Sequence, residues 1–388
     1  MKKTAITLIL ILSICLGMAT TVLAKGENEA EDTAAFALSA KSACLMDART
    51  GEVLYSHAEH EKASPASVTK IMTLLLVCEA LEHGSFTLED TVSISEYAAS
   101  MGGSQVFLEE GERFSVEELI KCTVIASAND AAVALAELVA GTEGAFVNKM
   151  NERAGELGLT DTAFENVTGL DDTAEKHYSS AIDIALMSRE LIKHDIITKY
   201  SSVWQDTIRN GEFTLTNTNR LVRYYDGCNG LKTGSTDKAG YCVSATAKRG
   251  EMQLIAVIMG APSRDARNQD ARTLLDYGFA SYALFCENVG FLENVPVLSG
   301  RRDFVAAQTS EFAKIVERAK LTSIERIYEI PEKLTAPVKK GDKIGRIIYK
   351  LDGEEIGSSD ILASDSVEKI GLFEIFCRIM ERILCFYD

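Results

Sequence analysis

A serine and a lysine three residues apart, Ser67 and Lys70, have the clearest capacity for chemistry in this sequence. They precede a largely apolar run at 71–77, which predicts a helix with Ser67 in its first turn. Positions i and i+3 share a helix face, so the lysine amine would lie beside the serine hydroxyl. A serine becomes a useful nucleophile when an adjacent base takes its proton. Lysine can be that base when burial or a neighbouring cation lowers its pKa.

The spacing alone is weak evidence, because a helix-capping serine followed by a solvated lysine has the same pattern. Two further motifs, Ser127-Ala128-Asn129 and Lys232-Thr233-Gly234, follow in order along the chain. The three together match the Ser-x-x-Lys, Ser-Asp-Asn and Lys-Thr-Gly signature of β-lactamases and penicillin-binding proteins, with alanine in place of the aspartate. From about residue 34 to its C-terminus, the sequence resembles the serine D-alanyl-D-alanine carboxypeptidases, which are low-molecular-mass penicillin-binding proteins.

The resemblance implies a reaction on peptidoglycan stem peptides that end in D-alanyl-D-alanine. Ser67 would attack the penultimate carbonyl, and Lys70 would accept its proton. Ser127 would relay a proton to the leaving amine, and Asn129 would orient Lys70 and the substrate backbone. Water would then hydrolyse the acyl-enzyme and release a shortened peptide. β-Lactam inhibitors are expected to acylate the same serine.

The substrate carboxylate requires a cationic partner, and the resemblance places it near the Lys-Thr-Gly motif. Lys232 and Thr233 would line that end of the cleft, and Lys232 would also help to hold the catalytic lysine neutral by repulsion. Gly234 would let the strand backbone approach the ligand. The N–H of Ser235, with that of the nucleophile, would form the oxyanion hole.

An arginine after the last strand is a further candidate for binding the carboxylate. Arg267 falls where the family places such a residue, and Arg264 is the competing choice. A surface salt bridge is the structural alternative for Arg267. His177 lies in a segment that resembles the family, but a structural histidine is the expectation there.

No metal or cofactor is expected, since no His, Cys and carboxylate cluster has zinc-ligand spacing and no glycine-rich phosphate loop occurs. The remaining histidines show no Ser-His-Asp context.

Three other functions remain open for the same motifs. A class A β-lactamase needs a deacylating glutamate, typically in a Glu-x-x-Leu-Asn pattern, and the corresponding segment 164–170 lacks it. Slow deacylation of β-lactams is therefore expected. A D,D-endopeptidase that cuts cross-links is hardly excluded, whereas the intact motifs argue against a noncatalytic peptidoglycan-binding protein.

The elements expected around these motifs predict an α+β fold. Short strands at 43–46 and 52–56 precede the Ser67 helix, which would stop near Gly84. Helices are expected from a capping box formed by Ser115 and Glu118, and at 131–140, 143–157, 180–194 and 271–285. Strands are expected at 231–234, 240–248 and 252–260. Strands at both ends imply one antiparallel sheet with flanking helices and an all-helical subdomain, the arrangement of the penicillin-binding and β-lactamase-like fold.

The C-terminal third has a different sequence pattern, without the catalytic motifs. Short β-like runs at 304–308, 324–330 and 343–351 predict a small β domain. Residues 367–388 carry bulky apolar side chains around most of a helix, with a narrower face of charged residues. We expect an amphipathic helix that anchors the chain on a membrane surface. Docking of this helix onto the β domain is the alternative.

The net charge and the N-terminal sequence indicate the cellular compartment and exclude one class of partner. The chain has 388 residues, and its net charge of −17 argues against nucleic acid as a partner. Two lysines, an apolar stretch and a possible cleavage site after Ala24 predict a signal peptide at 1–24, with a retained anchor as the alternative. The expected domains are then 25–286 (catalytic), 287–366 (β-rich) and 367–388 (helix), located on the outer face of the cytoplasmic membrane.

The nine cysteines leave the redox state open. Eight would remain after signal cleavage, and an even number in an exported chain is compatible with disulfides. However, Cys78, Cys122 and Cys242 sit in apolar segments, where cysteine packs as a small hydrophobic residue. We therefore expect free, mostly buried thiols.

Overall fold

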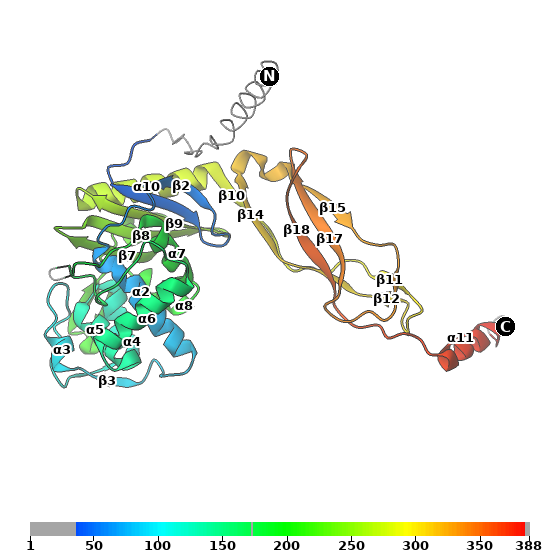
Figure 1. Ribbon diagram of the computed structural model, residues 1–388, viewed down its shortest axis with the longest axis horizontal. Helices are drawn as coiled ribbons and strands as arrows, with labels where there is room; N and C mark the ends of the chain where they lie inside the picture. The colour runs from blue at the N-terminus through cyan, green and yellow to red at the C-terminus, as the bar shows by residue number, and fades with distance from the viewer. Residues whose placement is uncertain (1–35, 172–173, 385–388) are drawn as a thin grey trace, which may run out of the picture. The chain divides into compact units, whose positions relative to one another are not determined.

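A computed structural model of the chain describes residues 36–171 and 174–384. The expected signal peptide at 1–24 lies outside the described residues. The central element is a five-stranded antiparallel sheet in the order β2-β1-β9-β8-β7 (Figure 1). Its strands are β1 Ser42–Asp47, β2 Val53–His57, β7 Cys228–Thr236, β8 Gly240–Arg249 and β9 Met252–Ala261. The prediction that the two ends of this region meet in one sheet is confirmed.

Helices cover both faces of the sheet, because alternate residues of its central strands point to opposite sides. Leu45 and Leu254 face Gly278 of α10 Arg264–Ser281. Cys44 and Ile255 point the other way, into the core that includes α2 Lys70–Glu82 and α7 Ala181–Leu191. In Figure 1, α10 lies above the sheet, and α2 and α7 lie below it.

The helical subdomain lies on the far side of α2. It contains α4 Val116–Ile125, α5 Asn129–Ala140 and α6 Glu143–Glu156. Helix α4 begins with the predicted capping box, in which the Ser115 hydroxyl accepts from the Glu118 N–H while the Glu118 carboxylate accepts from the Ser115 N–H. Helix α2 is therefore enclosed by sheet and helices, and its N-terminal residues Lys70–Thr73 are buried.

Shorter elements complete this region. They are β3 Thr91–Ser93, α3 Glu96–Ala99, β4 Arg113–Ser115, α8 Asp195–Ser201, β5 Gln205–Ile208, β6 Phe213–Thr216 and α9 Leu221–Tyr224. Helix α9 directly precedes β7 and packs against this strand, which carries the Lys-Thr-Gly motif.

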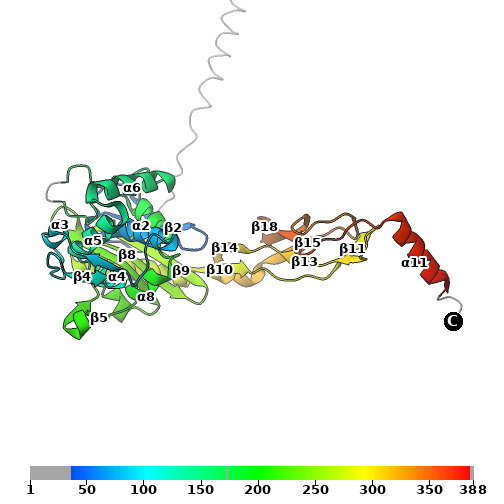
Figure 2. The same ribbon diagram turned by 90° about the horizontal axis from the view of Figure 1, so that it is seen from below.

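One predicted helix is shorter than expected. The helix expected over 271–285 ends at Ser281, and residues 282–285 belong to β10 Tyr282–Glu287. Strand β10 pairs with β14 Phe312–Glu317, and the two run side by side in Figures 1 and 2. Ala283 and Phe285 are buried by this pairing, so a tertiary partner overrides the helical pattern of the segment.

The C-terminal strands form small sheets around a core of their own. The elements are β11 Val295–Leu298, β12 Phe304–Val305, β13 Ala307–Thr309, β15 Glu325–Glu329, β16 Leu334–Thr335, β17 Lys343–Leu351 and β18 Glu354–Ala363. In this core Phe312 stacks on Tyr349 at a centroid distance of 4.2 Å, and Phe285 meets both rings edge-on. Val367 also belongs to the core, where its N–H donates to the Val338 carbonyl.

The last described element is helix α11, Leu372–Leu384. Its polar side chains contact the turn between β11 and β12. The Arg301 guanidinium lies 3.1 Å from the Glu374 carboxylate, and Arg378 donates to the Arg301 carbonyl. Among the described residues, no helix combines the length and apolar character needed to cross a bilayer.

The seven cysteines in the described ranges are free, as predicted. Cys44, Cys78, Cys122 and Cys242 are buried, while Cys228, Cys286 and Cys377 are partly exposed.

Candidate active site

Ser67 lies in a 3₁₀ turn, Ala66–Thr69, that leads directly into α2. The sequence predicted an α-helical first turn, but α2 itself begins at Lys70. Ala66 has a φ of 48°, a left-handed conformation that costs an L-residue free energy. The tight turn places the Ser67 hydroxyl 3.1 Å from the Lys70 amine.

Lys70 is fully buried, and its amine lies near three oxygen atoms. Besides Ser67 Oγ, these are Asn129 Oδ1 at 2.5 Å and the Thr168 carbonyl at 2.8 Å. Burial lowers the pKa of Lys70 well below its usual value, and the charge of Lys232 lowers it further. A neutral amine can donate to Asn129 and Thr168 and use its lone pair to accept the proton of Ser67.

The loop that supplies the Thr168 carbonyl was not predicted from the sequence. Asn166 Oδ1 accepts from the backbone N–H groups of Thr168 and Gly169, and this shapes the loop. Gly169 has a φ of +81°, and a Cβ there would lie 1.8 Å from the Ala66 carbonyl oxygen. The loop therefore packs directly on the nucleophile turn, and glycine is the residue that permits this contact.

The second lysine contacts the second serine. Lys232 Nζ donates to Ser127 Oγ at 2.7 Å and to the Thr233 carbonyl at 2.9 Å. Burial lowers the pKa of Lys232 to about 7, and the nearby Arg267 adds to this effect. Ser127 itself has a φ of 62°, so its hydroxyl is held by a turn between α4 and α5. The structure thus links Ser127 to Lys232 directly.

Asn129 connects Lys70 to the loop that contains Gly102. Its Oδ1 accepts from Lys70, and its Nδ2 donates to the Gly102 carbonyl at 2.7 Å. The amide is therefore oriented on both sides, which leaves one N–H of Asn129 for a further acceptor.

Strand β7 runs very close to the nucleophile turn. A Cβ at Gly234 would lie 2.8 Å from the Pro65 carbonyl oxygen and from the Ser67 nitrogen. Gly234 therefore allows the strand to approach the turn, whereas the sequence had suggested an approach to the ligand. On the same strand, Thr233 Oγ1 donates to Thr218 Oγ1 at 2.8 Å.

Next to these groups lies a cavity of about 590 Å³, the active-site cavity, whose lining does not include Lys70, Asn129 or Lys232. Of the predicted residues, it is lined by Ser67, Ser127, Thr233, Gly234, Ser235, Arg264 and Arg267. Residues that the sequence did not single out line it as well: Ser104, Trp204, Thr216, Asn217, Thr218, Arg220 and Tyr224. Within the described ranges, no aspartate or glutamate belongs to this lining. A run of polar residues at 216–220, upstream of the Lys-Thr-Gly motif, is the sequence signal that could have indicated these lining residues.

Arg267 and Arg264, the two arginines considered as partners of the substrate carboxylate, both line the cavity, and their surroundings differ. Arg267 is buried and donates to Asn268 Oδ1 at 2.9 Å, whereas Arg264 is exposed at the start of α10. Burial lowers the pKa of Arg267 to about 10, and the charge of Arg264 adds to it. Arg267 remains a cation at neutral pH, held in the cavity wall without a carboxylate partner among the described residues.

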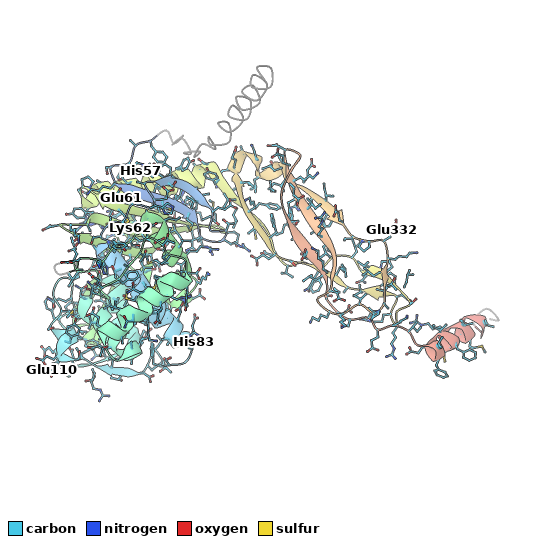
Figure 3. The ribbon with its side chains drawn as sticks, viewed as in Figure 1. His57, Glu61, Lys62, His83, Glu110 and Glu332 are labelled. Carbon is cyan, nitrogen blue, oxygen red and sulfur yellow. The ribbon has the colours of Figure 1, made fainter. Side chains whose placement is uncertain are left out.

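His177 has a structural role in the described geometry. Its Nδ1 accepts from the Glu165 N–H, so its Nε2–H faces Thr69 Oγ1 at 2.7 Å. Burial lowers the pKa of His177 to about 4, which keeps the ring neutral. Figure 3 labels two other histidines, His57 and His83, which lie far apart on the surface.

Comparisons with known proteins agree with this geometry. Residues 27–263 match a family model described as D-alanyl-D-alanine carboxypeptidase, and residues 282–369 match the C-terminal domain of penicillin-binding protein 5. The chain is 41% identical to D-alanyl-D-alanine carboxypeptidase DacF of Bacillus subtilis, over 97% of this chain and 98% of that protein. It is 35% identical to DacC of Escherichia coli, over 86% of each.

Solved structures show the same fold. Penicillin-binding protein 5 from Haemophilus influenzae superposes with a TM-score of 0.74 at 31% identity, covering 87% of this chain and 99% of that one. Penicillin-binding protein D2 from Listeria monocytogenes, solved with ampicillin bound, gives a TM-score of 0.58 at 31% identity, covering 62% and 98%.

Proposed function

This chain belongs to the D-alanyl-D-alanine carboxypeptidase family and is a serine D,D-carboxypeptidase of the penicillin-binding type, and we propose that Ser67 is its nucleophile. The observation that carries the proposal is the pairing of Ser67 Oγ with a buried lysine amine at 3.1 Å. Lys70 takes the proton of Ser67 as the hydroxyl attacks the penultimate carbonyl of the stem peptide. Neutral Lys70 can accept it because burial and Lys232 disfavour the ammonium.

The oxyanion forms next to backbone donors. The N–H groups of Ser67 and Ser235 stabilise the negative charge that develops on the carbonyl oxygen. The leaving amine of D-alanine then receives a proton through Ser127, whose hydroxyl both donates and accepts. Lys232 holds this hydroxyl at 2.7 Å. Water finally hydrolyses the acyl-enzyme, with Lys70 and Asn129 in place to assist.

The terminal carboxylate of the substrate binds at the cationic end of the cavity. Lys232 and Arg267 supply positive charge there, and Thr233 supplies a hydroxyl. Arg267 is favoured over Arg264 because it is buried in the cavity wall, where an ionic hydrogen bond is strong.

β-Lactams acylate the same serine, and the resulting acyl-enzyme is hydrolysed slowly. The only carboxylate in the segment expected to hold a deacylating glutamate is Glu165, which is exposed and accepts from the Lys176 N–H at 2.9 Å. It does not line the active-site cavity. A serine β-lactamase is therefore disfavoured.

The decisive experiment combines product release with covalent labelling. Ser67→Ala should abolish D-alanine release from a muramyl pentapeptide and abolish the penicillin adduct detected by mass spectrometry. Loss of a catalytic nucleophile lowers turnover by on the order of a millionfold. An adduct that persists on the variant would place the nucleophile elsewhere. Absence of an adduct on the wild-type chain would favour a noncatalytic peptidoglycan-binding protein.

We further propose that the chain is exported and held on the outer face of the cytoplasmic membrane by its C-terminal segment. The support is the exposure of apolar side chains on α11, where Leu372, Phe373 and Phe376 are 88%, 78% and 59% exposed. An apolar face of this kind suits the headgroup boundary of a bilayer. Residues 1–24 are proposed as the signal peptide, 25–286 as the catalytic domain, 287–366 as the β-rich domain and 367–388 as the anchor.

A further inference from the structure

A second cavity lies beside the segment that leads into the nucleophile turn. It has a volume of about 360 Å³, and its walls include the segment 61–64, Ser42 of β1 and Met259 of β9. Among the described residues, its lining and that of the active-site cavity have no member in common. Pockets for small molecules usually enclose roughly 300–1,000 Å³, so this space suits a compact ligand.

The wall of the second cavity contains a buried hydroxyl without a partner. Ser42 lies directly opposite Met259 in the β1–β9 pairing, so both side chains point to the same face of the sheet. Ser42 is 1% exposed, and its Oγ forms no hydrogen bond with a described residue. A buried polar group left unpaired is costly to folding. Its position in a cavity wall therefore points to a hydrogen-bonding group that arrives with a ligand.

Two lysines bring positive charge to the same cavity. The stem of Lys41 packs on Gly260, where a Cβ would lie 2.9 Å from Lys41 Cδ. Lys238 Nζ donates to the Ala174 carbonyl at 3.3 Å. Within the part of the chain that the structure describes, neither lysine forms an ion pair. Both charges are therefore available to a ligand.

The rim of the cavity carries both signs of charge. Lys62 is already engaged, since its amine lies 3.5 Å from the Asp161 carboxylate and 5.2 Å from the centre of the Tyr178 ring. Glu61 and Glu175 also belong to the lining, and both are exposed. Figure 3 labels Glu61 and Lys62 of this rim. Exposed carboxylates are well solvated, so they weaken the attraction for an anion without abolishing it.

The charges of the two available lysines reach the buried groups at the cavity wall. Burial lowers the pKa of His177, which lines the cavity, to about 4, and the charge of Lys238 adds to the lowering. Burial raises the pKa of Cys242, and the charges of Arg267 and Lys41 oppose this rise. The inner part of the second cavity is therefore at a positive potential.

We propose that the second cavity binds a small organic anion. Its carboxylate or phosphate group pairs with the ammonium groups of Lys41 and Lys238 and accepts the hydrogen bond of the Ser42 hydroxyl. The body of the ligand packs against Met259 and Tyr178. This site goes beyond the proposed function, which uses the active-site cavity alone.

The ligand would bind next to the structure that holds the nucleophile. The lining segment continues from Ser64 through Pro65 into the turn Ala66–Thr69. His177 Nε2 lies 2.7 Å from Thr69 Oγ1 in this turn. An anion that binds the native chain should also raise its melting temperature, because ligands that bind only the folded state stabilise it.

The first experiment measures binding with the active site closed. The full chain is acylated with penicillin, the adduct is verified by mass spectrometry, and the acyl-enzyme is titrated calorimetrically with benzoate, phenyl phosphate and benzamide. We expect saturable binding of at least one of the two anions to a single site, and none of neutral benzamide. The tighter anion identifies the acidic group as a carboxylate or a phosphate. Failure of both anions, or equal binding of benzamide, would overturn this inference and leave the proposed function intact.

Charge-removing variants assign the binding to the second cavity. Lys41→Gln and Lys238→Gln should each raise the dissociation constant of the tighter anion roughly 10-fold, the effect of losing one hydrogen bond to a charged partner. Lys149→Gln is the matched control, because Lys149 is exposed on α6 and outside the lining, and it should leave the constant unchanged. Equal constants in all three variants would contradict the site. If wild-type chain formed no penicillin adduct, which would contradict the proposed function, the same comparison on unacylated chain would still test the cavity.

The unpartnered hydroxyl allows a test that separates ligand binding from a structural role. Ser42→Ala should raise the dissociation constant of the anion about 5-fold, the effect of one hydrogen bond. It should not lower the melting temperature of the ligand-free chain, because no hydrogen bond of the folded state is lost. A lower melting temperature with unchanged anion binding would show that the hydroxyl serves the fold and would contradict its role toward a ligand.

Discussion

Two buried lysines of the active site each contact a serine, but they differ in what surrounds them. Lys70 meets only neutral oxygen acceptors, Ser67, Asn129 and Thr168. Lys232 has the Thr233 carbonyl and the positive charge of Arg267 as neighbours. Burial lowers the pKa of both, so the proposed mechanism uses Lys70 as a base and Lys232 as a titratable cation for the substrate.

A nearly isosteric change tests the base. Asn129→Asp places a carboxylate where Oδ1 lies 2.5 Å from the Lys70 amine. The negative charge favours the ammonium and raises the pKa of Lys70. Acylation at neutral pH should slow, and the acid limb of its pH profile should move to higher pH. Stopped-flow measurement of penicillin acylation at several pH values checks this, and an unshifted acid limb would contradict the role of Lys70.

Lys232, which is proposed to bind the substrate carboxylate, should give the pH profile of kcat/KM an alkaline limb. As pH rises past the Lys232 pKa of about 7, the ammonium is lost and so is its attraction for the terminal carboxylate. For a carboxylate substrate, kcat/KM should therefore fall above this pH, because that ratio reports ionisations of the free enzyme. An amidated analogue should show a flatter profile. Identical profiles for the two would show that Lys232 does not bind the carboxylate.

At the scale of elements, the site depends on three backbone segments that meet at the nucleophile turn. The turn Ala66–Thr69, the loop at Gly169 and strand β7 at Gly234 approach one another too closely for side chains. This contact delivers the Thr168 carbonyl to Lys70 and sets β7 beside Ser67.

Adding one methyl group should separate these segments. Gly169→Ala places a Cβ 1.8 Å from the Ala66 carbonyl, so the loop must move away from the turn. Gly158→Ala is the matched control, since Gly158 also has positive φ, +71°, but no neighbour within 4 Å. The control should lose only the roughly 1–2 kcal/mol of a left-handed alanine. Gly169→Ala should unfold at a clearly lower temperature and be acylated more slowly. Equal melting temperatures and acylation rates in the two variants would contradict the close contact.

The sequence predicted much of this architecture because its signals are local. Periodicity and turns gave the strands of the sheet, and Ser115 with Glu118 gave the start of α4. Long-range contacts were not predictable in the same way. The strand at Tyr282–Glu287 depends on a partner at Phe312–Glu317. Trp204 and Arg220 line the same cavity as Ser67, although they lie far from it in the sequence. The motif residues were identified by resemblance, while their hydrogen bonds required the structure.

At the scale of the whole molecule, two polar side chains of α11, Glu374 and Arg378, contact the β-rich region. Arg301 pairs with Glu374 and Glu368, and Arg378 lies 3.4 Å from Asp303. The apolar side chains of the helix remain exposed. Val367 is packed in the core of the β-rich region. A truncation that removes the helix but preserves this core must therefore begin after Val367.

A truncation tests the anchor. Removal of 371–388 should release an active carboxypeptidase from membranes, because the exposed apolar face is lost while Val367 is retained. Binding of the full chain to vesicles should depend weakly on salt, since the net charge of −17 gives no attraction to anionic lipid. Fractionation and D-alanine release check both points. A truncated chain that stays on membranes would indicate anchoring through its N-terminal segment instead.

The four buried thiols have a consequence for how the protein ages. Burial raises the pKa of Cys44 and Cys78 to about 12 and also raises that of Cys122 and Cys242. Since the thiolate is the species that oxidants and electrophiles attack, these sulfurs are inert while the fold is intact. The folded structure therefore protects these four thiols from oxidants and electrophiles. Irreversible oxidation of these cysteines would then record the history of unfolding, so a sample's sulfinic and sulfonic acid content would measure how often its molecules have opened.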